Sequence, residues 1–318
     1  MRERMNKVLL TGSTGFLGAH IKREFSKKYP DSVLIAPTRG EYDLMDRSSV
    51  SRMFQDLKPD VVIHLAAYSG GIGANKKFPA DFYYINTLLT ANVFDEAAKS
   101  KVKKMIYTMG GCSYPATSSS PIDESQMWNG YPQQESAGYS MAKKMGIVAS
   151  KSYRDQYGLN SVVLIPGNMY GEFDNFRLDE SHVVPAMFRR YFEAKQNKLG
   201  KISMWGTGAP VRDFVYAGDV AKNILFFLEN YDQSDPINIS SGTTTSIKDL
   251  ADTIKTVVGF DGVIDWDTSK PDGQMIKIFS TDKLSTLGLK CDTSLEQGLQ
   301  KTYKWFLENY NNSGAIRL

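Results

Sequence analysis

The chain has 318 residues, enough to bury a sizeable core in one large domain and a smaller one. Its 38 Lys and Arg against 35 Asp and Glu give a net charge of +3 without a block of like charge, which argues against nucleic acid as a partner but is compatible with small anionic ligands. No apolar stretch is as long as a membrane-spanning helix, and two cysteines do not make a disulfide framework, so we expect a cytoplasmic protein that spans no membrane.

Short apolar runs alternate with longer amphipathic stretches in the first half of the chain. The apolar runs predict strands at residues 8–11, 33–36, 61–67, 103–109 and 161–166. The amphipathic stretches predict helices at residues 16–28, 48–57, 80–99 and 139–157. Strands that alternate with helices favour right-handed βαβ units, so the predicted fold class is α/β, a doubly wound parallel sheet of the Rossmann type.

The alternation stops after residue 166, where a loop-rich region begins. We expect residues 1–166 and 214–239 to form the nucleotide-binding domain. Residues 167–213 and 240–318 are predicted to form a smaller α/β substrate domain, in which helical patterns at 246–258 and 295–310 provide a core.

A glycine-rich segment, GSTGFLG, follows the first predicted strand and opens the first predicted helix. Glycines at 12, 15 and 18 permit a tight turn and close backbone approach, and a helix N-terminus favours a pyrophosphate. The second strand ends near Arg39, where an acidic residue would bind the ribose of NAD. Arginine can neutralise a 2′-phosphate, which favours NADP, although a solvated surface arginine is the alternative reading.

Tyr139 and Lys143 lie four residues apart in a predicted helix and therefore share one face. A phenol can donate a proton to a carbonyl while hydride arrives from a nicotinamide, and a nearby ammonium lowers the phenol pKa. In a chain with 17 tyrosines such a pair can arise by chance, so its value depends on the glycine loop upstream.

The segments TGSTGFLG, HLAA, YSMAK and RDFVYAGDV together resemble the extended short-chain dehydrogenases/reductases. The segments GGIGAN, FPADFYYIN, CSYP, SHVVPAMFRR, WGTGAPVRDF, SKPDG and TYKWFLEN resemble the GDP-L-fucose synthase family within that group and extend over nearly the whole chain. The resemblance implies epimerisation of GDP-4-keto-6-deoxy-D-mannose at C3 and C5, reduction of its ketone with NADPH, and a homodimer.

The same resemblance assigns roles to individual residues. The implied catalytic residues are Tyr139, Lys143, Cys112 and His182. The implied cofactor-binding residues are Gly12, Ser13, Thr14, Gly15, Phe16, Leu17, Gly18, Arg39, Leu65, Ala66, Ala67, Tyr139, Lys143, Pro166, Asn168, Met169 and His182. The implied substrate-binding residues are Gly110, Gly111, Cys112, Asn168, Arg190, Trp205, Arg212 and Asp272, and no metal ligand is implied.

Each of these residue types suits its chemistry but also has a structural alternative. Protons beside a ketone are acidic enough for a thiolate or an imidazole, yet Cys112 could simply be buried and His182 could hydrogen-bond a loop. Trp205 could be a core aromatic rather than a stacking surface. The guanidinium of Arg212 suits a diphosphate but could pair with neighbouring Asp213.

The sequence departs from the resembled family at two positions. Gly110 stands four residues before Tyr114, where the family places a Ser or Thr hydroxyl that binds the ketone. The hydroxyls of Thr108 and Ser113, the backbone N–H groups of Gly111 and Cys112, and a bound water are candidate replacements.

The second departure is Thr14, which stands where the family often has a basic residue, so Arg39 bears more of the NADP preference. An enzyme with only the reductase or only the epimerase activity on a related 4-ketosugar, and a protein that senses NADP without catalysis, are the alternative readings.

Overall fold

The computed structural model describes residues 7–178, 180–270, 272–312 and 314–318, and the chain divides into two compact units. Unit 1 comprises residues 1–118, 124–166 and 220–239, and unit 2 comprises residues 119–123, 167–219 and 240–318. Residues 214–219, which the sequence assigned to the nucleotide-binding domain, group with unit 2. The reason is that Phe214–Tyr216 pairs in parallel with Asn168–Tyr170 of that unit.

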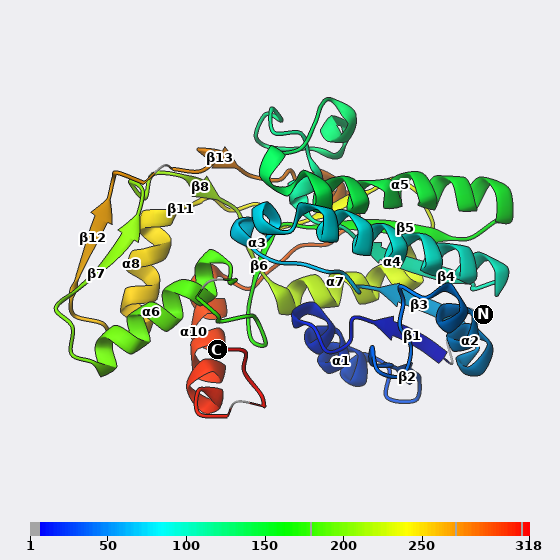
Figure 1. Ribbon diagram of the computed structural model, residues 1–318, viewed down its shortest axis with the longest axis horizontal. Helices are drawn as coiled ribbons and strands as arrows, with labels where there is room; N and C mark the ends of the chain where they lie inside the picture. Colours follow the sequence, from blue (N-terminus) through cyan, green and yellow to red (C-terminus); the bar gives the residue numbers. More distant parts are fainter. Residues whose placement is uncertain (1–6, 179, 271, 313) are drawn as a thin grey trace. The chain divides into compact units, whose positions relative to one another are not determined.

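Unit 1 contains a parallel sheet of six strands, and the predicted α/β doubly wound fold is thereby confirmed (Figure 1). The strands are β1 (Lys7–Thr11), β2 (Val33–Ile35), β3 (Val61–His64), β4 (Lys104–Thr108), β5 (Ser161–Pro166) and β10 (Ile237–Ile239). Their order is β10-β5-β4-β3-β1-β2, so the chain leaves β1 toward β2 and then returns to β3 on the other side of β1. Ligands of such sheets bind outside the carboxyl ends of the strands at this switch point.

Helices and short 3₁₀ turns surround this sheet. The helices and 3₁₀ turns of unit 1 are α1 (Phe16–Lys28), α2 (Arg47–Leu57), α3 (Ile72–Lys77), α4 (Pro79–Lys99), η1 (Gly111–Ser113), η2 (Glu124–Trp128), η3 (Gln134–Ser136), α5 (Ala137–Tyr157) and α7 (Ala217–Asn230), of which α7 begins in unit 2. Helix α4 packs against α2 and α5, and α4 and α5 run side by side in Figure 1. The hydroxyl of Tyr29, the residue after α1, donates a hydrogen bond of 3.0 Å to the Leu225 carbonyl of α7.

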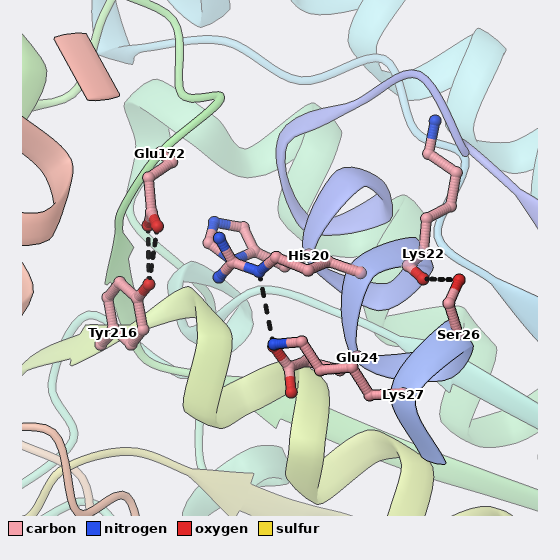
Figure 2. Close-up of polar contacts among 8 residues, drawn as sticks. His20, Lys22, Glu24, Ser26, Lys27, Glu172 and Tyr216 are labelled. Carbon is pink, nitrogen blue, oxygen red and sulfur yellow. Dashed lines mark hydrogen bonds and ion pairs between the residues drawn. The ribbon is translucent and has the colours of Figure 1, made fainter. Parts of the chain in front are cut away.

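Helix α1 also shows how local sequence fixes its ends. Gly15 precedes it in an extended conformation, and Lys27 and Lys28 lie in its last turn, where the helix dipole favours cations. Ser26 Oγ donates to the Lys22 carbonyl at 2.9 Å, and Lys27 pairs with Glu24 at 3.0 Å on the outer surface (Figure 2).

Unit 2 is built from short strands and three longer helices. Its elements are β6 (Asn168–Tyr170), α6 (Val183–Gln196), β7 (Lys201–Trp205), β8 (Val211–Arg212), β9 (Phe214–Tyr216), β11 (Thr245–Ser246), α8 (Ile247–Val258), β12 (Val263–Asp267), β13 (Ile276–Lys277), α9 (Asp282–Thr286) and α10 (Leu295–Asn309). The strands form a three-stranded sheet, β11-β8-β13, and two pairs, β12-β7 and β6-β9. Helix α6 was not predicted, because Pro185 in its first turn lies among loop-like segments.

The core of unit 2 is rich in aromatic side chains contributed by α6, α8, α10 and β9. Phe188, Tyr191 and Phe306 are fully buried in it. Beside this core, the Tyr216 hydroxyl donates to the Glu172 carboxylate at 2.7 Å (Figure 2). Among the described residues of both units, no helix is long and apolar enough to cross a membrane.

Candidate active site

The predicted glycine loop joins β1 to α1 at the switch point of the sheet. Gly12 has a φ of +73°, and a Cβ there would lie 2.7 Å from the Ala66 backbone nitrogen. A Cβ on Gly18 would lie 2.3 Å from the Gly12 carbonyl oxygen, so neither position admits a larger residue without a backbone shift. No side chain of the described residues caps the start of α1, and its first turn has no acidic residue. The loop therefore fits a pyrophosphate group, which the first-turn N–H groups can bind.

The segment after β3 lies against this loop. The backbone N–H of Ala66 donates to Thr11 Oγ1 at 3.3 Å, and that of Leu65 donates to the Thr11 carbonyl at 3.3 Å. These contacts place the predicted cofactor residues Leu65, Ala66 and Ala67 beside the glycine loop, and all three are half-buried. Arg39 is exposed near the end of β2, and its only polar contact among the described residues is the Met45 Sδ atom at 4.0 Å.

Helix α5 presents Tyr139 and Lys143 toward the loop that follows β4. A Cβ built on Gly110 would lie 3.8 Å from Tyr139 Oη and 3.2 Å from Cys112 Sγ. Ser140, one residue after Tyr139, donates a hydrogen bond of 3.1 Å to the Cys112 carbonyl and holds η1 against α5. Gly110, Cys112 and Tyr139 therefore lie together at the carboxyl end of β4, and Lys143 is near enough for the charge of Cys112 to raise its pKa.

Burial controls the protonation of this group. It lowers the pKa of Lys143 to about 7, although the charge of Cys112 raises it in part. Burial also raises the pKa of Tyr139 far above its ordinary value, and Cys112 and Tyr107 act in the same direction. The sequence led us to expect that the Lys143 ammonium lowers the phenol pKa, whereas the causes that act on Tyr139 in the structure, desolvation foremost, all raise it. Tyr139 consequently keeps its proton at neutral pH, as a proton donor requires.

The hydroxyl missing at Gly110 has one structural candidate for its replacement. Ser113 Oγ is fully buried and has no hydrogen-bond partner among the described residues. Thr108, one step deeper in β4, is also buried. An unpartnered buried hydroxyl is costly, so Ser113 is the candidate with a donor to spare.

In unit 2, the predicted histidine lies at the start of a helix. His182 is exposed at the N-cap of α6, and its side chain makes no capping hydrogen bond. Burial raises the pKa of Asp174 to about 6, whereas the charge of His182 lowers it. One carboxylate oxygen of Asp174 accepts the Asn175 N–H at 2.7 Å, and the other is buried and has no hydrogen-bond partner within the described part of the chain. Asp174 is thus a charged neighbour of His182 that the sequence did not single out.

Three further predicted cofactor residues lie at the end of β5 and the start of β6. Pro166 is the last residue of β5 in unit 1, and Asn168 and Met169 open β6 in unit 2. The Asn168 amide donates to the Asp213 carbonyl at 3.0 Å. The Asp213 carboxylate accepts the N–H groups of Ser241 and Gly242 at 3.1 and 3.2 Å.

The structure decides between the alternative roles of two predicted substrate residues, Arg212 and Trp205. The Asp213 carboxylate binds the 241–242 loop, and Arg212 forms no ion pair among the described residues; it donates to the Val211 carbonyl at 2.8 Å. Burial lowers the pKa of Arg212 without a carboxylate to compensate. Trp205 is 69% exposed at the end of β7, so it is not a core aromatic.

The two remaining substrate residues differ in their contacts. Arg190 is half-buried on α6 and, within the part of the chain that the structure describes, has no ion pair, whereas Arg189 binds Glu193 at 2.6 Å. The Asp272 carboxylate accepts the Thr207 N–H at 2.9 Å and its hydroxyl at 2.7 Å. Asp272 therefore holds the loop after β7 beside Trp205.

Comparison with known proteins gives consistent matches over most of the chain. The NAD dependent epimerase/dehydratase family matches residues 8–240. A GDP-L-fucose synthase of Sinorhizobium fredii is 40% identical over 303 residues, which cover 95% of this chain and 96% of that protein.

Two solved structures are also similar. A GDP-L-fucose synthetase of Naegleria fowleri bound to NADP has a TM-score of 0.91 at 29% identity, covering 100% of this chain and 97% of that one. A GDP-6-OMe-4-keto-L-xylo-heptose reductase of C. jejuni has a TM-score of 0.89 at 28% identity, covering 97% of this chain and 100% of that one. The resemblance seen in the sequence is thereby confirmed, and this chain belongs to the NAD dependent epimerase/dehydratase family.

Proposed function

We propose that this protein is a GDP-L-fucose synthase, which epimerises GDP-4-keto-6-deoxy-D-mannose at C3 and C5 and reduces its C4 ketone with NADPH. The observation that carries the proposal is the gathering of Cys112, Tyr139 and Lys143 at the end of β4. A ketone acidifies the protons on neighbouring carbons, so a thiol base and a phenol donor in one place suit both steps. The activity named for the Sinorhizobium fredii relative supports the same function.

NADP is the cofactor, and its reduced form, NADPH, would supply the hydride for the ketone carbon when bound. The uncapped start of α1 and the glycine loop bind its pyrophosphate, and Leu65, Ala66 and Ala67 line the neighbouring edge. The exposed Arg39 neutralises the 2′-phosphate. The further cofactor contacts of the proposal are Ser13, Thr14, Phe16, Leu17, Pro166, Asn168, Met169 and His182.

In the reduction, Tyr139 donates its proton to the ketone oxygen. The developing phenolate is stabilised by the Lys143 ammonium, which lies on the same face of α5. Because Lys143 is 2% exposed, its charge is poorly screened and acts strongly on the phenol. Gly110 leaves the ketone without a side-chain hydroxyl at that position, and Ser113 is the proposed substitute.

In the epimerisation, Cys112 of unit 1 is the proposed base and His182 of unit 2 the proposed acid, as the family resemblance implies. The thiolate removes a proton from carbon, and the imidazolium returns one to the opposite face of the sugar. Asp174 lies close enough to His182 for the charge of His182 to lower its pKa, which makes it the charged neighbour of the proposed acid.

Two guanidinium groups of unit 2 that form no ion pair with any described residue support binding of the GDP moiety. Arg190 and Arg212 offer bidentate donors to a diphosphate, and the exposed Trp205 offers a stacking surface. Asp272 orients the Trp205 loop through Thr207, and Gly111 and Asn168 complete the proposed substrate contacts.

A second activity is favoured by one specific observation, Gly110. The space left by the absent side chain suits a bulkier sugar, so reduction or epimerisation alone of a related nucleotide-linked 4-ketosugar is the alternative. The C. jejuni neighbour is named as a reductase of such a heptose. A non-catalytic sensor of NADP is disfavoured, because such a protein has no need of Cys112, Tyr139, Lys143 and His182 together.

We further propose that the protein is a homodimer joined through α4 and α5. These helices pack together and leave large apolar side chains exposed, among them Tyr84 at 58%, Met145 at 47% and Val148 at 40%. Cys112 and Cys291 form no disulfide within the described residues, in keeping with the reducing, cytoplasmic setting that we propose. Light scattering of the purified protein measures the oligomeric state, and a monomer at micromolar concentration contradicts the dimer.

The function is tested by adding GDP-4-keto-6-deoxy-D-mannose and NADPH to the protein in heavy water. We expect NADPH oxidation, deuterium at C3 and C5, and GDP-L-fucose as product. Cys112→Ser should abolish deuterium incorporation, whereas Tyr139→Phe should incorporate deuterium but reduce the ketone about 100- to 10,000-fold more slowly.

The two variants control for each other, since each leaves the other half-reaction intact. Reduction without deuterium exchange in the wild type would assign the alternative activity, a reductase of a related sugar. Unchanged exchange in Cys112→Ser would show that another residue is the base.

A further inference from the structure

Tyr107 is a fully buried tyrosine of β4 that no step of the proposed mechanism uses. Its ring is enclosed by Phe94 of α4, with centroids 5.4 Å apart, and by His64 of β3, with centroids 5.8 Å apart. Its hydroxyl lies 3.1 Å from Thr90 Oγ1 and donates to the Lys143 carbonyl at 3.2 Å. The ring is therefore fixed by three elements, β3, α4 and α5, against residues 143–146 of α5.

The Lys143 ammonium lies over this ring, with Nζ 4.2 Å from its centroid. The titratable groups that face Lys143 are His64 from β3, Tyr107 from β4, Cys112 from η1 and Tyr139 from its own helix. None of them is a carboxylate, and no ion pair of Lys143 exists among the described residues. The electron-rich face of an aromatic ring attracts a cation, and most strongly where water is excluded.

We propose that Tyr107 is a positioning residue for reduction, whose ring face holds Lys143 in place and in its charged form. This inference rests on the proposed role of Lys143 beside Tyr139. The ring substitutes for the carboxylate that usually accompanies a buried ammonium, and it does so without a negative charge that would bind Lys143 away from the phenol.

Helix α5 is shaped to accept this ring. Gly146 lies one turn after Lys143, and a Cβ there would be 2.1 Å from Tyr107 Cε1. Glycine is the least favourable residue in a helix interior after proline, so its presence in the middle of α5 needs a reason. The reason is that only glycine lets the ring approach the helix backbone below Lys143.

The test compares Tyr107→Phe, Tyr107→Leu and replacement of Tyr107 by 3,4,5-trifluorophenylalanine in the full chain. Phenylalanine keeps the ring face, fluorination keeps the shape but weakens the attraction for cations, and leucine removes the ring. The first readout is the Lys143 pKa, measured by NMR of protein with ¹³C-labelled lysine, with the signal assigned by Lys143→Arg. The second is the pH profile of NADPH oxidation with the ketosugar.

We expect Tyr107→Phe to retain the wild-type pKa and profile. The fluorinated and leucine variants should lower the Lys143 pKa by about 0.5 to 1.5 units, and the alkaline limb of the profile should move by the same amount. Gly146→Ala should produce the same shift, because its methyl group displaces the ring while every functional group remains.

An unchanged Lys143 pKa in the fluorinated variant would overturn the inference, and so would equal loss in the phenylalanine and leucine variants. The NMR readout needs no turnover. If the variants show the expected shifts of the Lys143 pKa but the wild type does not reduce the ketosugar, the proposed function is refuted. The interaction of Tyr107 with Lys143 is then still established.

Discussion

The residues proposed for reduction and those proposed for nucleotide-sugar recognition are held by the fold in opposite ways. In unit 1, Tyr107 and Lys143 are 0% and 2% exposed and are packed by side chains from several elements. In unit 2, Trp205 is 69% exposed, and Arg190 and Arg212 have no ion pair among the described residues.

This difference predicts how each region responds to substitution. Buried groups are desolvated before any ligand binds, so their charges already act in a low dielectric and are preorganised. Exposed groups lose water only when the substrate binds, so they contribute mainly to affinity. Substitutions in the buried region should therefore change kcat and stability, and those in the exposed region should change KM.

The largest effect is expected for Lys143→Met, which keeps the volume of the side chain and removes its charge. We expect kcat for reduction to fall about 1,000-fold, because the phenolate of Tyr139 loses its ammonium. The free energy of unfolding at pH 7 should rise, on the order of 2 to 4 kcal/mol, because the folded protein lowers the Lys143 pKa to about 7.

The sign can be checked by urea unfolding against pH. Between about pH 7 and the unfolded value of 10.5, the unfolded chain binds a proton that the folded protein does not, so wild-type stability rises with pH in this window. The methionine variant should lack this rise. A loss of stability in Lys143→Met would show that the charge of Lys143 stabilises the folded protein. It would contradict the description of this region as one that packing holds together.

The next effect is expected in the exposed region, for Trp205→Ala. Loss of a stacking surface should raise KM for the GDP-sugar about 10- to 100-fold with kcat nearly unchanged. Stability should change by no more than about 0.5 kcal/mol, because the indole is 69% exposed. Steady-state kinetics and urea unfolding measure both, and Phe260→Ala in the core of unit 2 serves as the destabilising control.

Most of the sheet could be predicted from the sequence, because apolar runs and amphipathic helices of unit 1 follow their expected periods. Helix α6 shows where this fails: Val184, Met187, Phe188 and Tyr191 have helical spacing and are buried, but Pro185 and nearby loop-like segments hid the pattern. The pairing of β6 with β9 could not be predicted, since short strands distant in sequence carry no local signal of their partner.

The candidate site was predictable only where a motif names a residue. Tyr139 and Lys143 share a helical face, and the glycine loop follows a strand, so both follow from spacing. Tyr107 and Asp174 could not be predicted in this way, because their importance depends on the residues that surround them. A tyrosine in a buried strand gives no sign that Lys143 lies over its ring.

A smaller effect is expected for Gly110→Ser, which restores the hydroxyl of the resembled family. The added Cβ would lie 3.2 Å from Cys112 Sγ, so the thiol must move by a few tenths of an ångström. We expect reduction to become about 10-fold faster, since one donor to an oxyanion is worth at least that much. Ser113→Ala should slow reduction in the wild type but not in Gly110→Ser. An equal effect of Ser113→Ala in both backgrounds would exclude Ser113 as the substitute donor.

His64 couples the buried region to acid stability and has no part in the proposed catalysis. Its Nδ1 shares a hydrogen bond of 2.7 Å with Thr11 Oγ1, while Nε2 is buried without a partner among the described residues. Burial, with a contribution from the charge of Lys143, lowers its pKa from 6.5 to about 3. Between these values the unfolded chain binds a proton that the folded protein does not, so stability falls as pH decreases through this window, by at most about 1.4 kcal/mol per pH unit. His64→Asn keeps an acceptor for Thr11 and should remove this slope in urea unfolding between pH 6.5 and 4. A slope that persists in the variant would assign the acid sensitivity to other groups.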